Sequence, residues 1–147
     1  MLTPEEHLKI FCIFKGVDPA TIPNQIDQTM KDVDLVSKAG AYSKNLSGGQ
    51  KWKLSVGIAL IGNSKLVMLD EPTSGMDLTA WRKIWDMLKR NKDGRVIILT
   101  THFMDEADIL GDRIGIMASG KIKCCGSSLF LKKWFGVGYN LVIAKVD

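Results

Sequence analysis

Two short, continuously apolar segments constrain the fold of this chain more than any other feature of its sequence. They are KLVMLD, residues 65–70, and RVIILTT, residues 95–101. Runs of this length are typical of parallel strands buried on both faces. The stretch between them places Trp81, Ile84 and Trp85 at helical spacing and predicts an amphipathic helix. A strand, a helix and a second strand in this order predict an α/β sheet.

Further elements are predicted on both sides of this unit. A helical section precedes it, and its first helix carries a capping box, in which Thr3 is the N-cap and Glu6 the reciprocal partner. The other expected elements are helices around residues 26–33 and from Gln50, a helix in 102–111, a hairpin of strands 113–118 and 121–126, a helix in 127–136 and a strand in 139–147. We therefore expect a helical region over residues 1–62 and a sheet-containing region over residues 63–147.

Composition excludes several classes of protein. The net charge is +4 and the pI about 9.0, but the basic residues are scattered, so a nucleic-acid groove is not expected. The longest apolar runs are far too short to span a bilayer. The acidic start MLTPEEHLK does not read as a signal peptide. The three cysteines have no metal-ligand spacing and no disulfide framework, so reduced, cytosol-side thiols are expected. Cys12 lies in an apolar helical run and is expected in the core.

Asp70 and Glu71 stand where the first apolar strand ends. In open α/β sheets, ligands bind at the carboxyl ends of the strands. One carboxylate can hold Mg²⁺ through water, and its neighbour can activate an attacking water. Pro72 favours a break into a loop, which lets the two carboxylates take different roles. The alternative is an acidic strand end that is only capped by a turn.

The second apolar strand ends in Thr100, Thr101 and His102. A histidine at this edge can donate to a terminal phosphate, although a merely polar strand end explains the same residues. His102 and Glu106 also have the i, i+4 spacing of a metal pair, but no third ligand accompanies them.

A third polar group, Ser47 with Gly48 and Gly49, lies just before an amphipathic helix. Glycines allow close backbone approach to a ligand, and free N–H groups at a helix start favour negative charge. An ordinary N-cap with flexible glycines is the alternative interpretation.

Taken together, LSGGQ, LDEPTSGMD and TTH resemble the nucleotide-binding domain of ATP-binding-cassette (ABC) proteins. They match the signature motif, the Walker B motif with the D-loop, and the switch histidine. The resemblance implies a partial P-loop NTPase fold, a mostly parallel sheet with a helical signature subdomain. The segments LTPEEHLKIFCIFKG, HFMDEADILGDRIGIMASGK and CCGSSLFLKKWFGVGY extend the likeness to nearly the whole chain. They are most similar to subfamily A, whose members are large lipid exporters.

The same resemblance implies a role for each site residue. ATP is sandwiched between two nucleotide-binding domains of a transporter. Asp70 would bind Mg²⁺, Glu71 would polarise water and His102 would contact the γ-phosphate. The remaining contacts, to ATP held by the partner domain, would come from Ser47, Gly48, Gly49 and Gln50 of the signature and Asp77 of the D-loop. The implied partners are a second nucleotide-binding domain, transmembrane domains and a lipid substrate, at the cytosolic face of a membrane.

The family's P-loop and Q-loop have no counterpart in these 147 residues. The nearest match to G-x-x-x-x-G-K-[ST], GIMASGKI at residues 115–122, has Ile122 in place of the Mg²⁺-binding hydroxyl and is followed by a strand pattern. We therefore expect a truncated domain whose isolated chain binds ATP weakly or not at all. Because the family's P-loop strand pairs inside the sheet, we also expect the isolated chain to aggregate or unfold partly.

Three positions depart from the family pattern. Trp52 and Trp81 stand where arginine is usual, and Leu78 replaces a common proline. The loss of a cation at Trp52, beside a phosphate-facing turn, bears most directly on signature function.

Two functional hypotheses remain open. The chain is either an ATP-hydrolysing module of a subfamily A lipid transporter or a non-enzymatic fragment that docks on an intact domain and supplies only the signature half-site. A soluble ABC ATPase of DNA repair or translation is disfavoured because such proteins lack the CCGSSLFLKKWFG type of tail.

Overall fold

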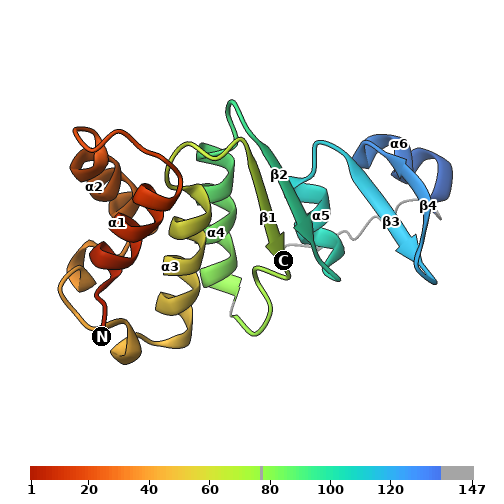
Figure 1. Ribbon diagram of the computed structural model, residues 1–147. Helices are drawn as coiled ribbons and strands as arrows, with labels where there is room; N and C mark the ends of the chain where they lie inside the picture. The colour runs from red at the N-terminus through yellow and green to blue at the C-terminus, as the bar shows by residue number, and fades with distance from the viewer. Residues whose placement is uncertain (77, 137–147) are drawn as a thin grey trace, which may run out of the picture. The chain divides into compact units, whose positions relative to one another are not determined.

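The computed structural model describes residues 1–76 and 78–136 (Figure 1). The chain divides into two compact units, Met1–His102 and Phe103–Asp147, which are treated separately below. The boundary expected between residues 62 and 63 lies inside the first unit, and that division of the chain remains a prediction. Among the described residues, no helix combines the length and the apolar character that crossing a bilayer requires.

Three helices form the first part of the unit Met1–His102. They are α1 (Pro4–Phe14), α2 (Ile22–Asp32) and α3 (Gly48–Leu60), and they contact one another pairwise. Two single 3₁₀ turns, η1 (Val36–Lys38) and η2 (Ser43–Asn45), occupy the loop before α3. The interior is apolar and includes Leu8, Cys12, Met30, Val33 and Leu54. The expected core position of Cys12 is therefore confirmed.

The predicted capping box at the start of α1 is present. Thr3 Oγ1 accepts a hydrogen bond from the Glu6 amide at 3.3 Å, and Glu6 Oε2 accepts one from the Thr3 amide at 2.8 Å. Each bond satisfies a backbone donor that the helix itself leaves unpaired. The sequence alone was sufficient to predict this helix start because the motif is local.

Lys15 closes the far end of α3, a contact that the sequence did not indicate. Its Nζ lies within hydrogen-bond distance of four oxygens: the carbonyls of Ile58 (2.8 Å), Ala59 (3.0 Å) and Ile61 (2.8 Å) and the hydroxyl of Ser64 (2.8 Å). A cation at a helix C-terminus satisfies carbonyls that have no intrahelical partner. Burial lowers the pKa of Lys15, as expected for an ammonium drawn out of water.

The strand–helix–strand unit follows α3. Strand β1 (Leu66–Asp70), helix α4 (Leu78–Arg90) and strand β2 (Val96–Thr100) form a parallel two-stranded sheet with its crossover helix (Figure 1). The register pairs Leu66 with Val96 and ends by pairing Asp70 with Thr100. The carboxyl ends of both strands therefore meet at one edge, as the sequence predicted.

The expectation that both strands are buried on both faces was wrong. Val67 is only 2% exposed, but Met68 is 70% and Val96 60% exposed. Successive strand side chains point to opposite faces, and burial along β1, which contacts α3, alternates accordingly. One face of the sheet is thus packed, while the other presents the side chains of Leu66, Met68, Val96 and Ile98 to solvent.

This apolar sheet face supports a prediction about self-association. We expect the double substitution Met68→Thr, Ile98→Thr to raise the fraction of monomer in the isolated chain, because exposed apolar surface favours association and Thr keeps the strand propensity. Sedimentation velocity over a concentration series measures it. The matched control is Ile13→Thr with Phe14→Thr on α1, where two exposed apolar side chains lie outside the sheet. An equal gain from the control would contradict a specific role of the sheet face.

The unit Phe103–Asp147 holds a second, antiparallel sheet. Its described elements are α5 (Met104–Leu110), β3 (Ile114–Ala118), β4 (Lys121–Gly126) and α6 (Ser128–Phe135). Asp108 joins α5 to α6, because it accepts hydrogen bonds from Ser128 and, at 2.7 Å, from Lys132. These bonds lower the pKa of Asp108, with that from Lys132 the larger cause. The strand expected in residues 139–147 lies outside the described residues.

Candidate functional site

Thr100, the last residue of β2, forms hydrogen bonds with the residues at the end of β1. The Thr100 hydroxyl donates a hydrogen bond to Asp70 Oδ1. The Glu71 amide donates back to both the hydroxyl and the carbonyl of Thr100, each at 3.1 Å. One residue of β2 thus contacts both the carboxylate of Asp70 and the backbone amide of Glu71.

Glu71 has an unusual backbone conformation. Its φ is +42°, in the left-handed region that non-glycine residues adopt rarely. Such a conformation costs about 1–3 kcal/mol and occurs preferentially at functional sites. Strand β1 ends at Asp70, and this conformation takes Glu71 out of the strand, which is the break that Pro72 predicted.

Glu71 and His102 meet across the two strand ends. His102 Nδ1 lies 3.1 Å from Glu71 Oε1, and the side chains are 57% and 48% exposed. A pair this exposed contributes little to folding stability, at most about 1 kcal/mol. The contact therefore orients two reactive groups at an open edge of the sheet.

The acidic residues here fit a magnesium site with few protein ligands. Mg²⁺ keeps several waters and is usually held by one or two carboxylates together with substrate phosphates. Asp70 is exposed, and its two oxygens provide more acceptor positions than the one hydrogen bond from Thr100 uses. Across the described residues, no cluster of three or more His, Cys, Asp or Glu side chains could form an all-protein cage. The exposed carboxylate of Asp70 therefore fits a site of this kind.

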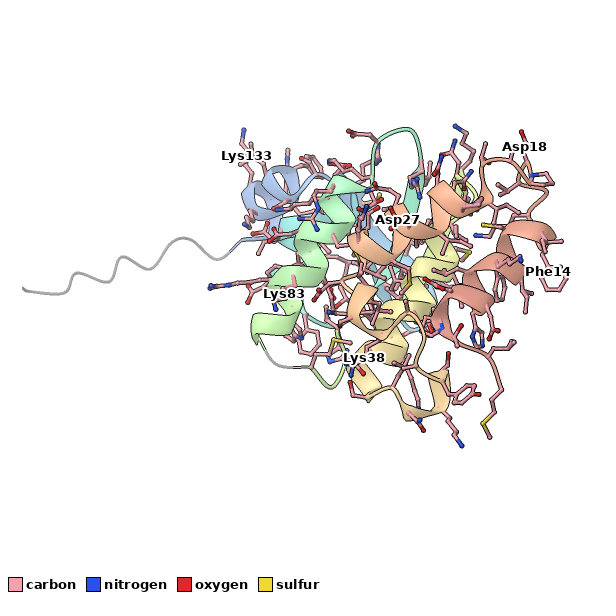
Figure 2. The ribbon with its side chains drawn as sticks, turned by 90° about the vertical axis from the view of Figure 1, so that its left-hand side faces the viewer. Phe14, Asp18, Asp27, Lys38, Lys83 and Lys133 are labelled. Carbon is pink, nitrogen blue, oxygen red and sulfur yellow. The ribbon has the colours of Figure 1, made fainter. Side chains whose placement is uncertain are left out.

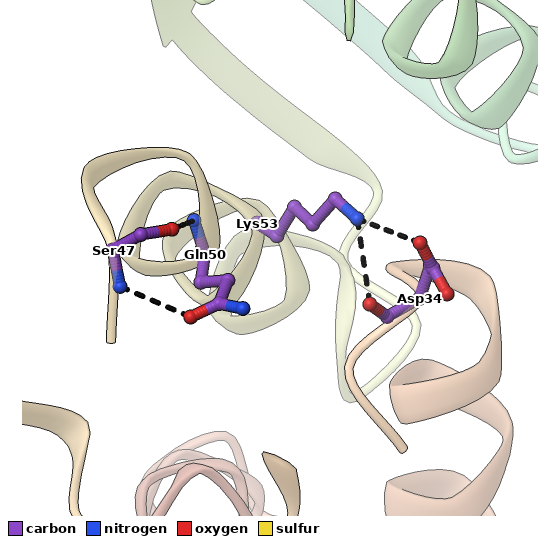
Figure 3. A network of polar contacts seen from close by, with 4 residues as sticks. All are labelled: Asp34, Ser47, Gln50 and Lys53. Carbon is purple, nitrogen blue, oxygen red and sulfur yellow. Dashed lines mark hydrogen bonds and ion pairs between the residues drawn. The ribbon is translucent and has the colours of Figure 1, made fainter. Parts of the chain in front are cut away.

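The signature residues gather at the start of α3. Ser47 is the N-cap, and Gly48 and Gly49 form the first turn. Ser47 Oγ accepts from the Gln50 amide at 3.3 Å, and Gln50 Oε1 accepts from the Ser47 amide at 3.0 Å (Figure 3). The helix therefore has a second capping box. Ser47 therefore acts as an N-cap within the chain. Because its hydroxyl accepts in this contact, the hydroxyl proton can still be donated.

Lys53, the residue after Trp52, uses its cation in a contact within the domain. Lys53 Nζ binds Asp34 Oδ2 at 2.8 Å and the Asp34 carbonyl at 3.4 Å, joining α3 to the end of α2 (Figure 3). Asp34 has φ +53°, in the left-handed region that Asn and Asp tolerate best. The hydrogen bond from Lys53 holds the pKa of Asp34 below its ordinary value.

This pair supports a pH prediction. Because the folded-state pKa of Asp34 is depressed, the stability from the pair is present above the ordinary value of 3.8 and is lost as pH falls through the lower folded value. We expect Asp34→Asn, which keeps the left-handed preference, to cost less than about 1 kcal/mol at neutral pH and to flatten the acid limb of stability. Urea midpoints measured against pH test it, with Asp93→Asn as the control.

The two tryptophans have different explanations. Trp81 donates from Nε1 to the Thr73 carbonyl at 2.9 Å and packs against Trp85 with ring centroids 6.0 Å apart. Trp52 is half-buried and lines a cavity of about 510 Å³ together with Gln50 and residues of α4. Lys83, which projects from α4 in Figure 2, also borders this cavity. Trp81 is thus built into the fold, and Trp52 lies beside the signature.

The predicted site residues thus fall into two groups. The structure brings Asp70, Glu71 and His102 together at the sheet edge, and it gathers Ser47, Gly48, Gly49 and Gln50 at the start of α3. Asp77 lies outside the described residues. In the sequence, Thr100 is only one of three polar residues at a strand end, and nothing there indicates the contact of Lys53 with Asp34. Thr100 could have been identified as the register partner of Asp70, but the sequence alone does not give the strand register.

This arrangement is that of an ABC-type ATP-binding domain. The ABC transporter family model matches residues 2–74. A solved ATP-binding subunit of an ABC transporter superposes with a TM-score of 0.79 at 25% identity, covering 92% of this chain and 57% of that one. The chain therefore belongs to the ABC transporter family, and its α/β fold is part of a P-loop NTPase domain.

The similar sequences narrow the assignment to subfamily A. The chain is 52% identical over 144 residues to phospholipid-transporting ATPase ABCA3 of Rattus norvegicus, covering 98% of this chain and 8% of that protein. It is 48% identical over 146 residues to ABC transporter A family member 11 of Arabidopsis thaliana, covering 99% of this chain and 15% of that protein. The chain thus spans a small part of the length of these curated relatives.

Proposed function

We propose that this chain is part of an ATP-hydrolysing module that couples ATP hydrolysis to lipid transport in a subfamily A transporter. The observation that carries the proposal is the meeting of Glu71 and His102 beside Asp70 where two parallel strands end. A fold that places these groups at the carboxyl edge of a sheet puts them where nucleotides bind. The rat relative is named as a phospholipid-transporting ATPase, which supports lipid as the cargo.

In this proposal the three residues divide the chemistry. Asp70 would hold Mg²⁺, and the bound ion would neutralise charge on the phosphates. Glu71 accepts a proton from, or polarises, the water that attacks the γ-phosphate. His102 holds Glu71 in position and contacts the phosphate as a donor. Because the pair is exposed, closure by a partner surface would be needed to exclude water and strengthen these interactions.

The signature residues serve a different nucleotide. Ser47, Gly48 and Gly49 are exposed at the start of a 13-residue helix, where backbone N–H groups and a hydroxyl favour an anion. We assign them, with Gln50 and Asp77, to ATP held by a second nucleotide-binding domain. Transmembrane domains would complete the transporter, with this module on the cytosolic face.

A chimaera tests this function. This chain replaces the matching 144-residue segment of the rat relative, and ATP hydrolysis by the purified protein is measured. We expect the chimaera to hydrolyse ATP in a Mg²⁺-dependent manner. Hydrolysis that is indistinguishable from a preparation lacking Mg²⁺ would contradict the proposal.

The non-enzymatic fragment is a second candidate, favoured by the exposure of the signature residues in the chain itself. In that case the 147-residue chain would be captured by an intact nucleotide-binding domain only when ATP is present. A pull-down with and without ATP decides, and the matched control is Ser47→Arg, which places a bulky cation at the docking surface. Capture that does not depend on ATP would count against this candidate.

A further inference from the structure

We infer that Thr100 is a positioning residue for ATP hydrolysis, holding the magnesium ligand Asp70 and the base Glu71 in one arrangement through its hydroxyl. The inference rests on the proposed function of these two carboxylates. It adds a residue from the neighbouring strand that acts through Asp70 and Glu71.

The geometry carries the inference because one hydroxyl serves both acidic residues. Thr100 Oγ1 donates its single proton to Asp70 Oδ1 and accepts the Glu71 amide at 3.1 Å. A hydroxyl has one donor and two acceptor positions, so these two bonds use its donor and leave acceptor capacity on the same oxygen. Asp70 and Thr100 are direct register partners, which places their side chains on the same face of the sheet.

The consequence for Asp70 is orientation. A carboxylate on an exposed strand end can rotate about its terminal bond. The hydrogen bond to Oδ1 favours one rotamer of Asp70 and leaves Oδ2 as the oxygen that Thr100 does not contact. A hydrogen bond to an ionised group is among the stronger ones in proteins, so the orientation is well held.

The consequence for Glu71 is conformational. Its left-handed backbone is secured by the amide bonds to Thr100 and by its carbonyl, which accepts from the Ser74 amide at 3.0 Å. That backbone sets where the Glu71 carboxylate meets His102. Loss of the hydroxyl removes one of the two acceptors of the Glu71 amide, while the Thr100 carbonyl remains. We therefore expect a loosened base in a domain that still folds.

Steady-state hydrolysis by the chimaera tests the catalytic part. Thr100→Val keeps the shape and removes the hydroxyl, and we expect kcat to fall about tenfold while KM for ATP changes less than about twofold. Thr100→Ser restores the hydroxyl and should retain kcat within about twofold. Ile98→Val, two residues earlier on the same exposed face, is the matched control and should leave both constants unchanged. Equal impairment by Val and Ser, or a fall no larger than that of Ile98→Val, would overturn the inference.

A second readout separates this inference from the proposed function. In the 147-residue chain, amide hydrogen exchange at Glu71 should accelerate about fivefold in Thr100→Val and not in Thr100→Ser, with Met68 in mid-strand unchanged. Unchanged exchange at Glu71 would overturn the inference whatever the kinetics show. An inactive chimaera with wild-type residues would contradict the proposed function, and the exchange result would still decide whether Thr100 holds Glu71.

Discussion

We expect Glu71→Gln to lower ATP turnover of the chimaera by roughly 100-fold or more, the usual contribution of a positioned general base. The amide keeps the size of the side chain and can still accept from His102, so the contact at 3.1 Å can persist without the charge. KM for ATP should change little, because in the proposed function the residue acts on the attacking water rather than on binding the nucleotide. Turnover is measured at saturating ATP and Mg²⁺.

Asp93→Asn is the matched control for this experiment. Asp93 is an exposed carboxylate in the turn that precedes β2, at the opposite end of the strand from His102. It loses the same charge without touching the site, so turnover should be unaffected. Retention of more than about a tenth of the activity in Glu71→Gln would exclude Glu71 as the principal base.

The second large effect is expected in the helical core. Leu8→Ala should lower the free energy of unfolding by about 2–5 kcal/mol, the range for truncating a buried leucine. Leu8 is fully buried on α1, and it lies close to α3 where Gly57 has no side chain. A Cβ at Gly57 would lie 3.2 Å from Thr29 and 3.6 Å from Leu8. Packing this close leaves little room for the site to collapse around a cavity.

Urea unfolding followed by circular dichroism measures this effect as a lower midpoint with an unchanged slope. Phe14→Ala on the same helix is the control, because Phe14 is 77% exposed and its ring points away from the helices in Figure 2. Its cost should stay within about 0.5 kcal/mol, as is usual for surface substitutions. Similar midpoints for the two variants would show that the helical core is not packed as described.

Local patterns were sufficient to predict most of the elements. Thr3 with Glu6 specified the start of α1, and the spacing of Ile84 and Leu88 specified α4 and its buried face. The motif residues Asp70, Glu71 and His102 could be named because their order along the chain resembles that of a known family. Each of these inferences uses residues close in sequence, where backbone geometry alone determines which side chains are neighbours.

Burial could not be read from the same patterns. Val96 and Ile98 belong to an apolar run that predicted a strand covered on both faces, yet both are exposed. Periodicity reports which residues share a face, whereas coverage depends on which other elements pack there. In this sheet, β1 contacts α3, and its residues alternate between buried and exposed.

The sequence by itself determined the class of this protein, since LSGGQ, LDEPTSGMD and TTH in this order identify an ABC nucleotide-binding domain and nominate its reactive groups. Only the tertiary structure decided how those groups are held. Thr100 reaches Asp70 across 30 residues of chain, Lys15 reaches the end of α3 across more than 40, and the contact of Glu71 with His102 spans 31. The physical reason is that strand register and helix packing determine these partners, and no local sequence pattern encodes either of them.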